Sequence, residues 1–209
     1  MTPHNPWNDL LDLVRHDREG LFLARAARHA AELAAVRPVC VAGQPYGRML
    51  LHHTGLGEVL LAGWRPGARC APHDHGQARG LVAVLEGSFT ETTYQFDGSG
   101  LRATAERDYS LGDSLRAPPG LVHDLYAADG GLTLHVYVPR IEAMRVYDVR
   151  EQETLLVTGD SGAWIPDRAE FVVERRRWVT GSGEQRMARC WSPSPTSSRA
   201  EWGSTSRHR

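Results

Sequence analysis

The chain has 209 residues, 41% of them hydrophobic, and a formal net charge of −1 at pH 7. This length and composition predict one folded domain with a full apolar core. A net charge so close to zero provides no general attraction for nucleic acid or for a membrane surface, so we expect neither as a partner. The sequence contains no apolar run of about 18 residues and no secretory signal pattern. We therefore expect a cytoplasmic protein, and we expect it to be a monomer.

The N-terminal segment, residues 1–39, is predicted to form short helices that pack on the domain that follows. Hydrophobic residues repeat at helical spacing between residues 9 and about 36, and the segment is rich in Ala. Asn8 or Asp9 is a suitable N-cap for the first helix. Gly20 interrupts the pattern, so two shorter helices are expected in place of one long helix.

Residues 40–170 are predicted to form a β domain. Short strand-like runs alternate with Gly, Pro and Asp turns at residues 59–61, 81–85, 89–94 and 132–138. Such regular spacing of short strands is typical of a sandwich or a barrel. Residues 171–209 form a C-terminal extension, which we expect to be largely disordered from about residue 180. Its Ser-, Pro- and Arg-rich sequence cannot bury enough apolar surface to offset the entropy of ordering.

Two histidines in the β domain have the spacing of a metal-binding pair. His73 and His75 are two residues apart, so on a strand both side chains point to the same face, whereas Asp74 points to the other. Taken alone, this pair fits a metal site and ordinary core or surface histidines equally well. Cys70 lies three residues before His73 and would point to the opposite face of a continuous strand. We therefore do not expect Cys70 to be a ligand.

A second segment strengthens the prediction of a metal site. The two segments read Gly67-x5-His73-x-His75-x4-Gly80-x6-Gly87 and Gly112-x5-Pro118-x-Gly120-x2-His123. Together they resemble the two-part pattern of the cupin superfamily, which implies a mainly β fold, a double-stranded β-helix or jelly-roll barrel. The resemblance implies a metal ion bound by His73, His75 and His123. Most metal-binding cupins have Glu at the position of Gly80, so three neutral imidazoles would leave the ion its full double positive charge.

A closer resemblance is to the bacterial cysteine dioxygenases, and it extends over about residues 40–165. The matching pieces are Pro45-Tyr46-Gly47-Arg48, Trp64-x8-His73-Asp74-His75-Gly76-Gln77, Val84-Leu85-Glu86-Gly87, Gly120-Leu121-Val122-His123 and Thr133-Leu134-His135-Val136-Tyr137-Val138-Pro139. Members of this family oxidise the thiol of L-cysteine to a sulfinate with O2 and non-heme Fe(II). The resemblance therefore implies one Fe(II) per chain, with L-cysteine and O2 as substrates. An all-histidine site suits this chemistry, because the thiolate supplies the negative charge that a carboxylate ligand usually provides.

The same resemblance assigns the residues around the metal. It makes Arg48, with Tyr46 nearby, the receptor for the substrate carboxylate. It places the hydroxyl of Tyr137 beside the reacting sulfur and oxygen, oriented by His135, which in turn meets Thr133. These last three residues are spaced by two, so on one strand they share a face. Spacing alone favours an ordinary strand with a polar face, and the metal segments favour a functional row.

Two positions depart from the family pattern. Thr133 stands where the family often has Ser, a mild change because the hydroxyl is retained. In animal members the position of Gly80 is a Cys that forms a thioether with the active-site tyrosine. Glycine has no sulfur, so we expect Tyr137 to be an unmodified phenol.

Other functions remain open at this point. Three histidines and a water also suit a Zn or Mn isomerase or hydrolase of the cupin type, and a non-catalytic cupin that binds a small ligand is a further alternative. A dioxygenase for 3-mercaptopropionate or another small thiol is a nearer relative. Enzymes for 3-mercaptopropionate typically have Gln at the position of Arg48, so Arg48 favours cysteine. His52 and His53 are adjacent and face opposite sides of a strand, so they are not expected to chelate one ion.

Overall fold

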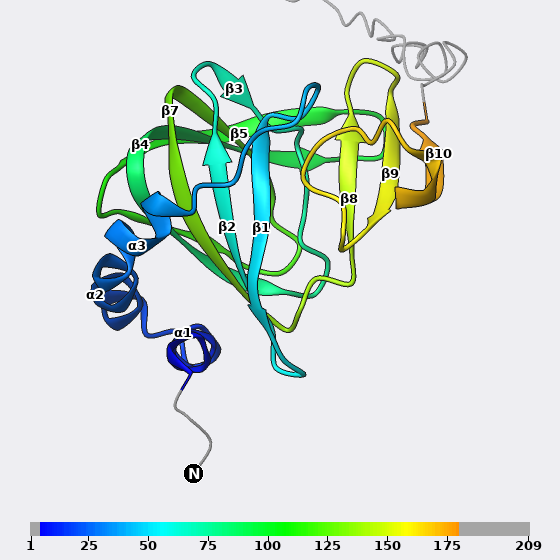
Figure 1. The fold of residues 1–209 in the computed structure, drawn as a ribbon. Helices are drawn as coiled ribbons and strands as arrows, with labels where there is room; N and C mark the ends of the chain where they lie inside the picture. The colour runs from blue at the N-terminus through cyan, green and yellow to red at the C-terminus, as the bar shows by residue number, and fades with distance from the viewer. Residues whose placement is uncertain (1–4, 180–209) are drawn as a thin grey trace, which may run out of the picture. The chain divides into compact units, whose positions relative to one another are not determined.

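The computed structural model describes residues 5–179 of the chain, and the segment predicted to be disordered from about residue 180 lies outside them. The elements in chain order are α1 (Pro6–Arg15), α2 (Glu19–Arg28), α3 (Ala30–Ala35), β1 (Tyr46–His53), β2 (Glu58–Trp64), β3 (Ala68–Arg69), β4 (Arg79–Phe96), β5 (Leu101–Ser110), β6 (Ser114–Ala117), β7 (Val122–Val138), β8 (Ala143–Asp148), β9 (Glu153–Thr158), a short 3-10 turn (Ala169–Phe171) and β10 (Val172–Arg177). The predicted mainly β architecture with short N-terminal helices is confirmed (Figure 1). None of the helices within residues 5–179 is long and apolar enough to cross a membrane.

The strands form two antiparallel sheets. The larger sheet has the order β1-β2-β7-β4-β5, with β3 paired to β7 and β6 paired to β4, and the smaller has the order β10-β9-β8. His73 joins the two sheets, because it forms bridges both to His123 of β7 and to Val146 of β8. A predicted metal ligand therefore lies at the place where the barrel closes.

The N-terminal helices differ in detail from the prediction. There are three in place of two, and the first break falls at Asp17, which has a positive φ of 55°, while Gly20 lies inside α2. The expected caps Asn8 and Asp9 are wrong, because Asn5 caps α1 by accepting a hydrogen bond from Trp7 N. Pro fits the first helical position after such a cap, since its missing N–H is not needed there.

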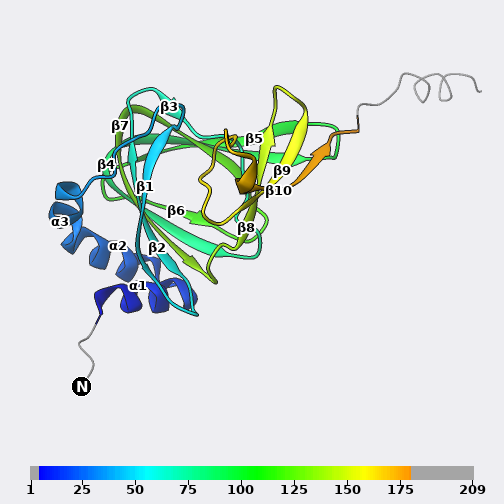
Figure 2. The same ribbon diagram turned by 45° about the vertical axis from the view of Figure 1, so that its right-hand side comes forward.

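These helices cover the outer face of the β2-β7-β4 layer, as Figures 1 and 2 show. Leu10, Leu11 and Phe22 from the helices share one apolar cluster with strand residues such as Leu61 and Leu134. The remaining side chains of the same strands point into the barrel, because successive residues of a strand alternate between its faces. The alternation thus divides each central strand into a structural outer face and an inner face that is available for a site.

Strand β4 contains both runs that the sequence predicted as separate strands, 81–85 and 89–94. The register shifts between Gly87 and Phe89, and Gly87 has a positive φ of 84°. A Cβ at this position would lie 2.1 Å from the carbonyl oxygen of Gly130, so the close approach of β4 to β7 requires glycine. The irregularity lets one half of β4 pair with β6 and the other with β5.

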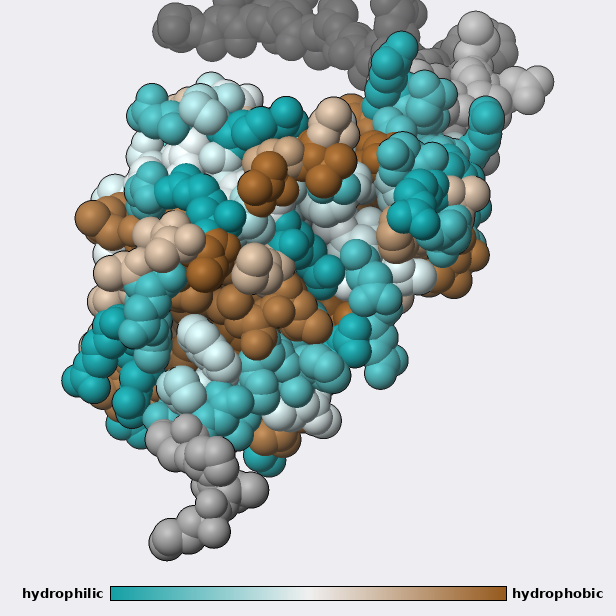
Figure 3. All heavy atoms as spheres, in the orientation of Figure 1, coloured by the Kyte–Doolittle hydropathy of each residue, from teal (hydrophilic) through white to brown (hydrophobic). Residues whose placement is uncertain are grey.

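Strand β1 lies at the edge of the larger sheet, where it pairs with β2. Met49 and Leu50 of this strand are exposed, as is Val39 in the segment that leads to it. Figure 3 shows apolar side chains gathered on this face, over β1 and β2. The inner side of β1 is buried at Tyr46 and carries the next inward-facing residue, Arg48, towards the barrel interior.

The β structure continues beyond residue 170, where the sequence placed the end of the β domain. Strand β10 pairs with β9 over Val172–Arg177, and the indole N–H of Trp178 donates to Thr154 Oγ1 at 2.9 Å. This strand ends in the run Arg175-Arg176-Arg177, which suits the edge of a sheet, because charged side chains there discourage pairing with other molecules.

Candidate active site

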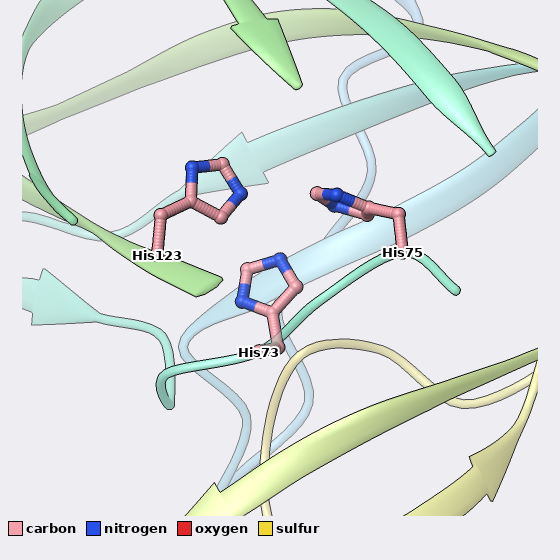
Figure 4. A group of neighbouring side chains, drawn as sticks. All are labelled: His73, His75 and His123. Carbon is pink, nitrogen blue, oxygen red and sulfur yellow. The ribbon is translucent and has the colours of Figure 1, made fainter. Parts of the chain in front are cut away.

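The three predicted metal ligands come together inside the barrel. The ligand atoms of His73, His75 and His123 all lie within 4.8 Å of one another, and their residues are 6%, 3% and 2% exposed. Figure 4 shows the three rings turned towards a common space, His123 from β7 and the other two from the segment before β4. Three convergent imidazoles are a recognised donor set for divalent transition metals.

Local backbone geometry explains this convergence. His73 and His123 are cross-strand neighbours that exchange backbone hydrogen bonds of 2.9 and 3.0 Å. His75 follows two residues after His73 and so points to the same side. Asp74 points away, as alternation predicts, and its carboxylate accepts hydrogen bonds from the backbone N–H groups of Gly76 and Arg145. Asp74 is therefore held in a structural role outside the cluster.

Burial keeps two of these histidines, His73 and His75, neutral. Burial, with a smaller contribution from neighbouring His123, lowers the pKa of His73 to about 3. Burial and the adjacent His73 also lower the pKa of His75 well below its ordinary value. A neutral imidazole keeps a free lone pair on one nitrogen, which is the form that binds a metal.

Hydrogen bonds orient two of the rings. His73 donates through Nδ1 to the carbonyl oxygen of Ala71 at 2.9 Å, and His123 donates through Nδ1 to Glu91 Oε1 at 2.6 Å. In both rings Nε2 is therefore the nitrogen that remains for a metal. His75 Nδ1 is buried without a hydrogen-bond partner among residues 5–179, and its Nε2 lies 3.1 Å from Tyr137 Oη.

Glu91 is a functional candidate that the sequence analysis missed. Its carboxylate is buried, accepts from His123 Nδ1, and accepts from the hydroxyl of Tyr109 at 3.0 Å. A carboxylate behind a ligand histidine fixes the ring and raises its basicity. The sequence did contain a hint of this role. Glu91 lies two residues after the apolar Phe89, so on a strand both side chains face the same, buried side.

The predicted polar row on β7 exists as a chain of hydrogen bonds. Thr133 Oγ1 lies 2.7 Å from His135 Nε2, and His135 Nδ1 lies 3.1 Å from Tyr137 Oη. Burial, followed by the effect of His123, lowers the pKa of His135 to about 3. Burial raises the pKa of Tyr137 well above its ordinary value, so its phenol keeps its proton. The row therefore ends in a neutral hydroxyl beside the histidine cluster.

Arg48 and Tyr46 both contact the loop after β9, residues 159–163. The Arg48 guanidinium donates to the carbonyl oxygens of Gly159 at 2.8 Å and Asp160 at 3.3 Å. The Tyr46 hydroxyl accepts a hydrogen bond from the backbone N–H of Ala163 at 2.8 Å. Tyr46 thus holds the loop that faces Arg48. No motif in the sequence marks this loop, since its contacts are made through backbone atoms.

The three histidines, Tyr137 and Arg48 all line one cavity of about 50 Å³. Its walls are mostly apolar, and its polar and ionisable lining residues include Arg48, His73, His75, His123, His135 and Tyr137. This volume accommodates the equivalent of a few water molecules. The cavity therefore suits a compact substrate with an anionic group at the Arg48 end.

Cys70 also lines this cavity, which corrects the expectation that it points away from His73. Strand β3 ends at Arg69, so the strand is not continuous from Cys70 to His73. Cys70 Sγ accepts a hydrogen bond from Leu125 N at 3.1 Å and lies 4.0 Å from His73 Nδ1. Burial raises the pKa of its thiol to about 12. Cys70 is not part of the three-histidine cluster.

Gly80 lies against the ring of Tyr137. The two residues are direct partners in the β4–β7 ladder, and a Cβ at position 80 would lie 2.5 Å from the Tyr137 Cδ1 and Cε1 atoms. The position next to the tyrosine ring is thus occupied by a residue without a side chain.

Comparison with protein families identifies one match. Residues 31–117 match the family described as cysteine dioxygenase type I. The match includes His73, His75, Tyr46 and Arg48 and ends before His123. The structure brings His123 to the first two histidines independently of that match.

Several solved structures resemble part of the chain. They include KdgF from Halomonas sp., with 22% identity, coverage of 48% of this chain and 86% of that chain, and a TM-score of 0.41. An RmlC-like cupin from Shewanella frigidimarina has 21% identity, coverage of 47% and 80%, and a TM-score of 0.40. A conserved protein with a double-stranded β-helix domain from Klebsiella pneumoniae has 20% identity, coverage of 52% and 84%, and a TM-score of 0.43.

Proposed function

We propose that this cysteine dioxygenase-like protein of the cupin superfamily binds one Fe(II) and oxidises L-cysteine with O2 to cysteine sulfinic acid. The observation that carries the proposal is the cavity shared by three buried histidines, the Tyr137 hydroxyl and the Arg48 guanidinium. A Zn or Mn hydrolase would use the histidines but has no evident use for the Tyr137 row.

The donor set fits a divalent ion. His73 and His123 have their Nδ1 atoms engaged and their Nε2 atoms free, and His75 is buried and neutral. Fe(II) held by these residues would supply O2 activation and would bind the substrate sulfur as thiolate. Because no protein carboxylate belongs to the cluster, an anionic sulfur ligand is favoured.

Arg48 is suited to hold the substrate carboxylate. A guanidinium has five N–H donors, and the two backbone carbonyls leave several of them free for a ligand. The carbonyl contacts fix the guanidinium without neutralising its charge. A carboxylate can therefore form a charge-assisted, bidentate pair with it.

The reaction needs no external reductant. One thiol and one O2 give one sulfinic acid, with two new S–O bonds and the O–O bond broken. Tyr137 keeps its proton and can donate a hydrogen bond to an oxygen that gains negative charge. Arg48 orients the substrate, and the apolar cavity walls exclude water.

The test combines metal analysis with a thiol panel. Iron content, O2 uptake and sulfinate are measured with L-cysteine, 3-mercaptopropionate and cysteamine. We expect iron in near-equal amount to protein and fastest turnover with L-cysteine. His123→Ala should lose most iron and nearly all activity, while His53→Ala, an exposed histidine outside the site, should keep both. Full iron occupancy in His123→Ala would rule out this site, and a preference for 3-mercaptopropionate would correct the substrate.

A further inference from the structure

Trp64, at the end of β2, begins a buried chain of hydrogen bonds that leads to the metal cluster. Its indole Nε1 donates to Thr133 Oγ1 at 2.8 Å. From there the chain continues to His135 Nε2 at 2.7 Å, from His135 Nδ1 to Tyr137 Oη at 3.1 Å, and from Tyr137 Oη to His75 Nε2 at 3.1 Å. Trp64 and Thr133 are 4% and 0% exposed, so bulk solvent does not reach the hydrogen bond between them.

The chemistry of the first donor sets the direction of the whole chain. An indole N–H can donate but cannot accept, so the hydroxyl hydrogen of Thr133 cannot point towards Trp64. That hydrogen instead points to His135 Nε2, which must then be the unprotonated nitrogen. His135 is neutral, because burial lowers its pKa to about 3. Its proton is therefore on Nδ1 and is donated to Tyr137 Oη.

The opposite direction leaves a buried donor without an acceptor. If His135 carried its proton on Nε2, Thr133 would accept from both His135 and Trp64. The Thr133 hydrogen would then have no acceptor among residues 5–179, in a site that is fully buried. A buried unsatisfied hydroxyl is costly enough to disfavour this arrangement by about tenfold or more.

We propose that Trp64 is a positioning residue that fixes the direction of this chain, so that Tyr137 receives a hydrogen bond from His135 and directs its own proton towards the metal cluster. In the opposite arrangement the Tyr137 proton would point to His135 Nδ1 and away from the cavity. The proposal deepens the proposed function, since it explains how Tyr137 is prepared as a donor. The hydrogen positions themselves depend neither on a metal nor on a thiol substrate.

The direct test is the tautomer of His135 in the metal-free protein. Long-range proton–nitrogen NMR correlations of isotope-labelled histidine distinguish a proton on Nδ1 from one on Nε2, and His135→Gln assigns the signal. We expect the Nδ1–H form in about tenfold excess or more. A dominant Nε2–H form would overturn the proposal, whatever thiol the protein oxidises.

A substitution then tests the part played by Trp64. In Trp64→Phe the donor is lost, and the smaller ring leaves room beside Thr133 for a water, which both donates and accepts. The two tautomers of His135 should then be mixed, and less of the consumed O2 should appear as sulfinate. Trp7→Phe, on α1 and outside the cavity, is the matched control and should leave the tautomer unchanged. An unchanged tautomer in a folded Trp64→Phe protein would refute the role of Trp64.

A second pair of variants keeps the test decisive if Trp64→Phe does not fold. Thr133→Ser keeps the hydroxyl between Trp64 and His135 and should retain the Nδ1–H form. Thr133→Ala removes the hydroxyl and leaves room for a water, which can either donate to His135 Nε2 or accept from it, so the preference should be weakened. The same strong preference in both variants would show that the chain from Trp64 does not set the direction.

Discussion

At the residue scale, recognition of a carboxylate depends on a single guanidinium. Arg48 is held by two main-chain carbonyls of the loop 159–163, and no carboxylate among residues 5–179 forms a hydrogen bond with it. The cavity that it faces is small and mostly apolar. Charge-assisted hydrogen bonds are strong in such surroundings, because water competes poorly for the partners.

Substitution of Arg48 should separate thiols that have a carboxylate from those that lack one. A bidentate pair contributes on the order of 1.5–3 kcal/mol, so Arg48→Ala should lower kcat/KM for L-cysteine by roughly ten- to hundred-fold. Cysteamine, which has no carboxylate, should lose little. Arg48→Lys keeps the positive charge but lacks the planar guanidinium, so its kcat/KM for L-cysteine should lie between those of the wild type and Arg48→Ala. Equal losses for both thiols would contradict a carboxylate-specific role.

Glu91 should affect metal affinity more than substrate affinity. Removing its charge in Glu91→Gln weakens the support of His123, and such changes typically cost about 10–100-fold in metal affinity. Competition with a chelator measures this directly on the folded protein. Glu106→Gln, an exposed position on the neighbouring strand β5, is the matched control. Unchanged metal affinity in Glu91→Gln would mean that the carboxylate only fills space.

The histidine cluster and the row on β7 were predicted from the resemblance to the cysteine dioxygenases. Alternation along the chain added only that His73 and His75 share one face of their strand and that the three residues of the row share a face of theirs. The partners of these residues were not predictable in the same way. Trp64 appeared in a matching motif, yet its bond to Thr133 depends on the register of β2 against β7. The loop 159–163 reaches Arg48 through carbonyl oxygens, which any sequence would supply.

At the element scale, the pairing of β4 with β7 shapes the site. It places Gly80 opposite Tyr137 and Thr93 opposite His123. The predicted strands 81–85 and 89–94 form the single strand β4, because the positive φ of Gly87 lets the chain bend there while its pairing with β7 continues. The prediction of short N-terminal helices was confirmed, but the predicted N-cap was wrong. The choice among Asn5, Asn8 and Asp9 depends on one local hydrogen bond.

Gly80→Ala should disturb the site through the ring of Tyr137. The added Cβ would lie 2.5 Å from two ring atoms, so either the ring or the strand must move. Overpacking of this kind costs about 1–3 kcal/mol, and we expect a lower melting temperature and a lower yield of sulfinate per O2. Gly55→Ala, where the added atom meets nothing within 4 Å, should have little effect. Wild-type stability and coupling in Gly80→Ala would show that the ring is free to shift.

The pairing of Gly80 with Tyr137 also predicts that the tyrosine is not cross-linked. With Gly80 as its neighbour, the intact protein should have its sequence mass apart from N-terminal processing, with no loss of two hydrogens. A mass lower by two hydrogens, mapped to a Tyr137 peptide, would mean that another thiol, such as that of Cys70, had formed the link. Intact mass spectrometry of the purified protein decides between the two outcomes.

At the scale of the whole molecule, the buried site makes stability depend on pH. His73 and His135 have a pKa of about 3 in the folded protein and an ordinary value of 6.5. Below pH 6.5 the unfolded chain therefore takes up protons that the folded protein does not. The contribution of these two neutral histidines to the free energy of unfolding is fully present above pH 6.5 and is lost as the pH falls towards 3.

The metal-free protein should accordingly melt at lower temperature in mild acid. Each such histidine changes stability by up to about 1.4 kcal/mol per pH unit, so the melting temperature should fall by roughly 5–10 °C between about pH 7.5 and 5.5. His135→Gln removes one titrating group and should flatten the slope. A melting temperature that does not change over this range would mean that the histidines accept protons without unfolding.

The fate of O2 tests the proposed function of the whole molecule most directly. The iron-loaded protein is given L-cysteine under isotopically heavy O2, and the product is analysed by mass spectrometry. We predict cysteine sulfinic acid with two heavy oxygen atoms, and none in the His123→Ala protein. Product that contains one heavy oxygen or none, or cystine without sulfinate, would contradict dioxygenation at the three-histidine site.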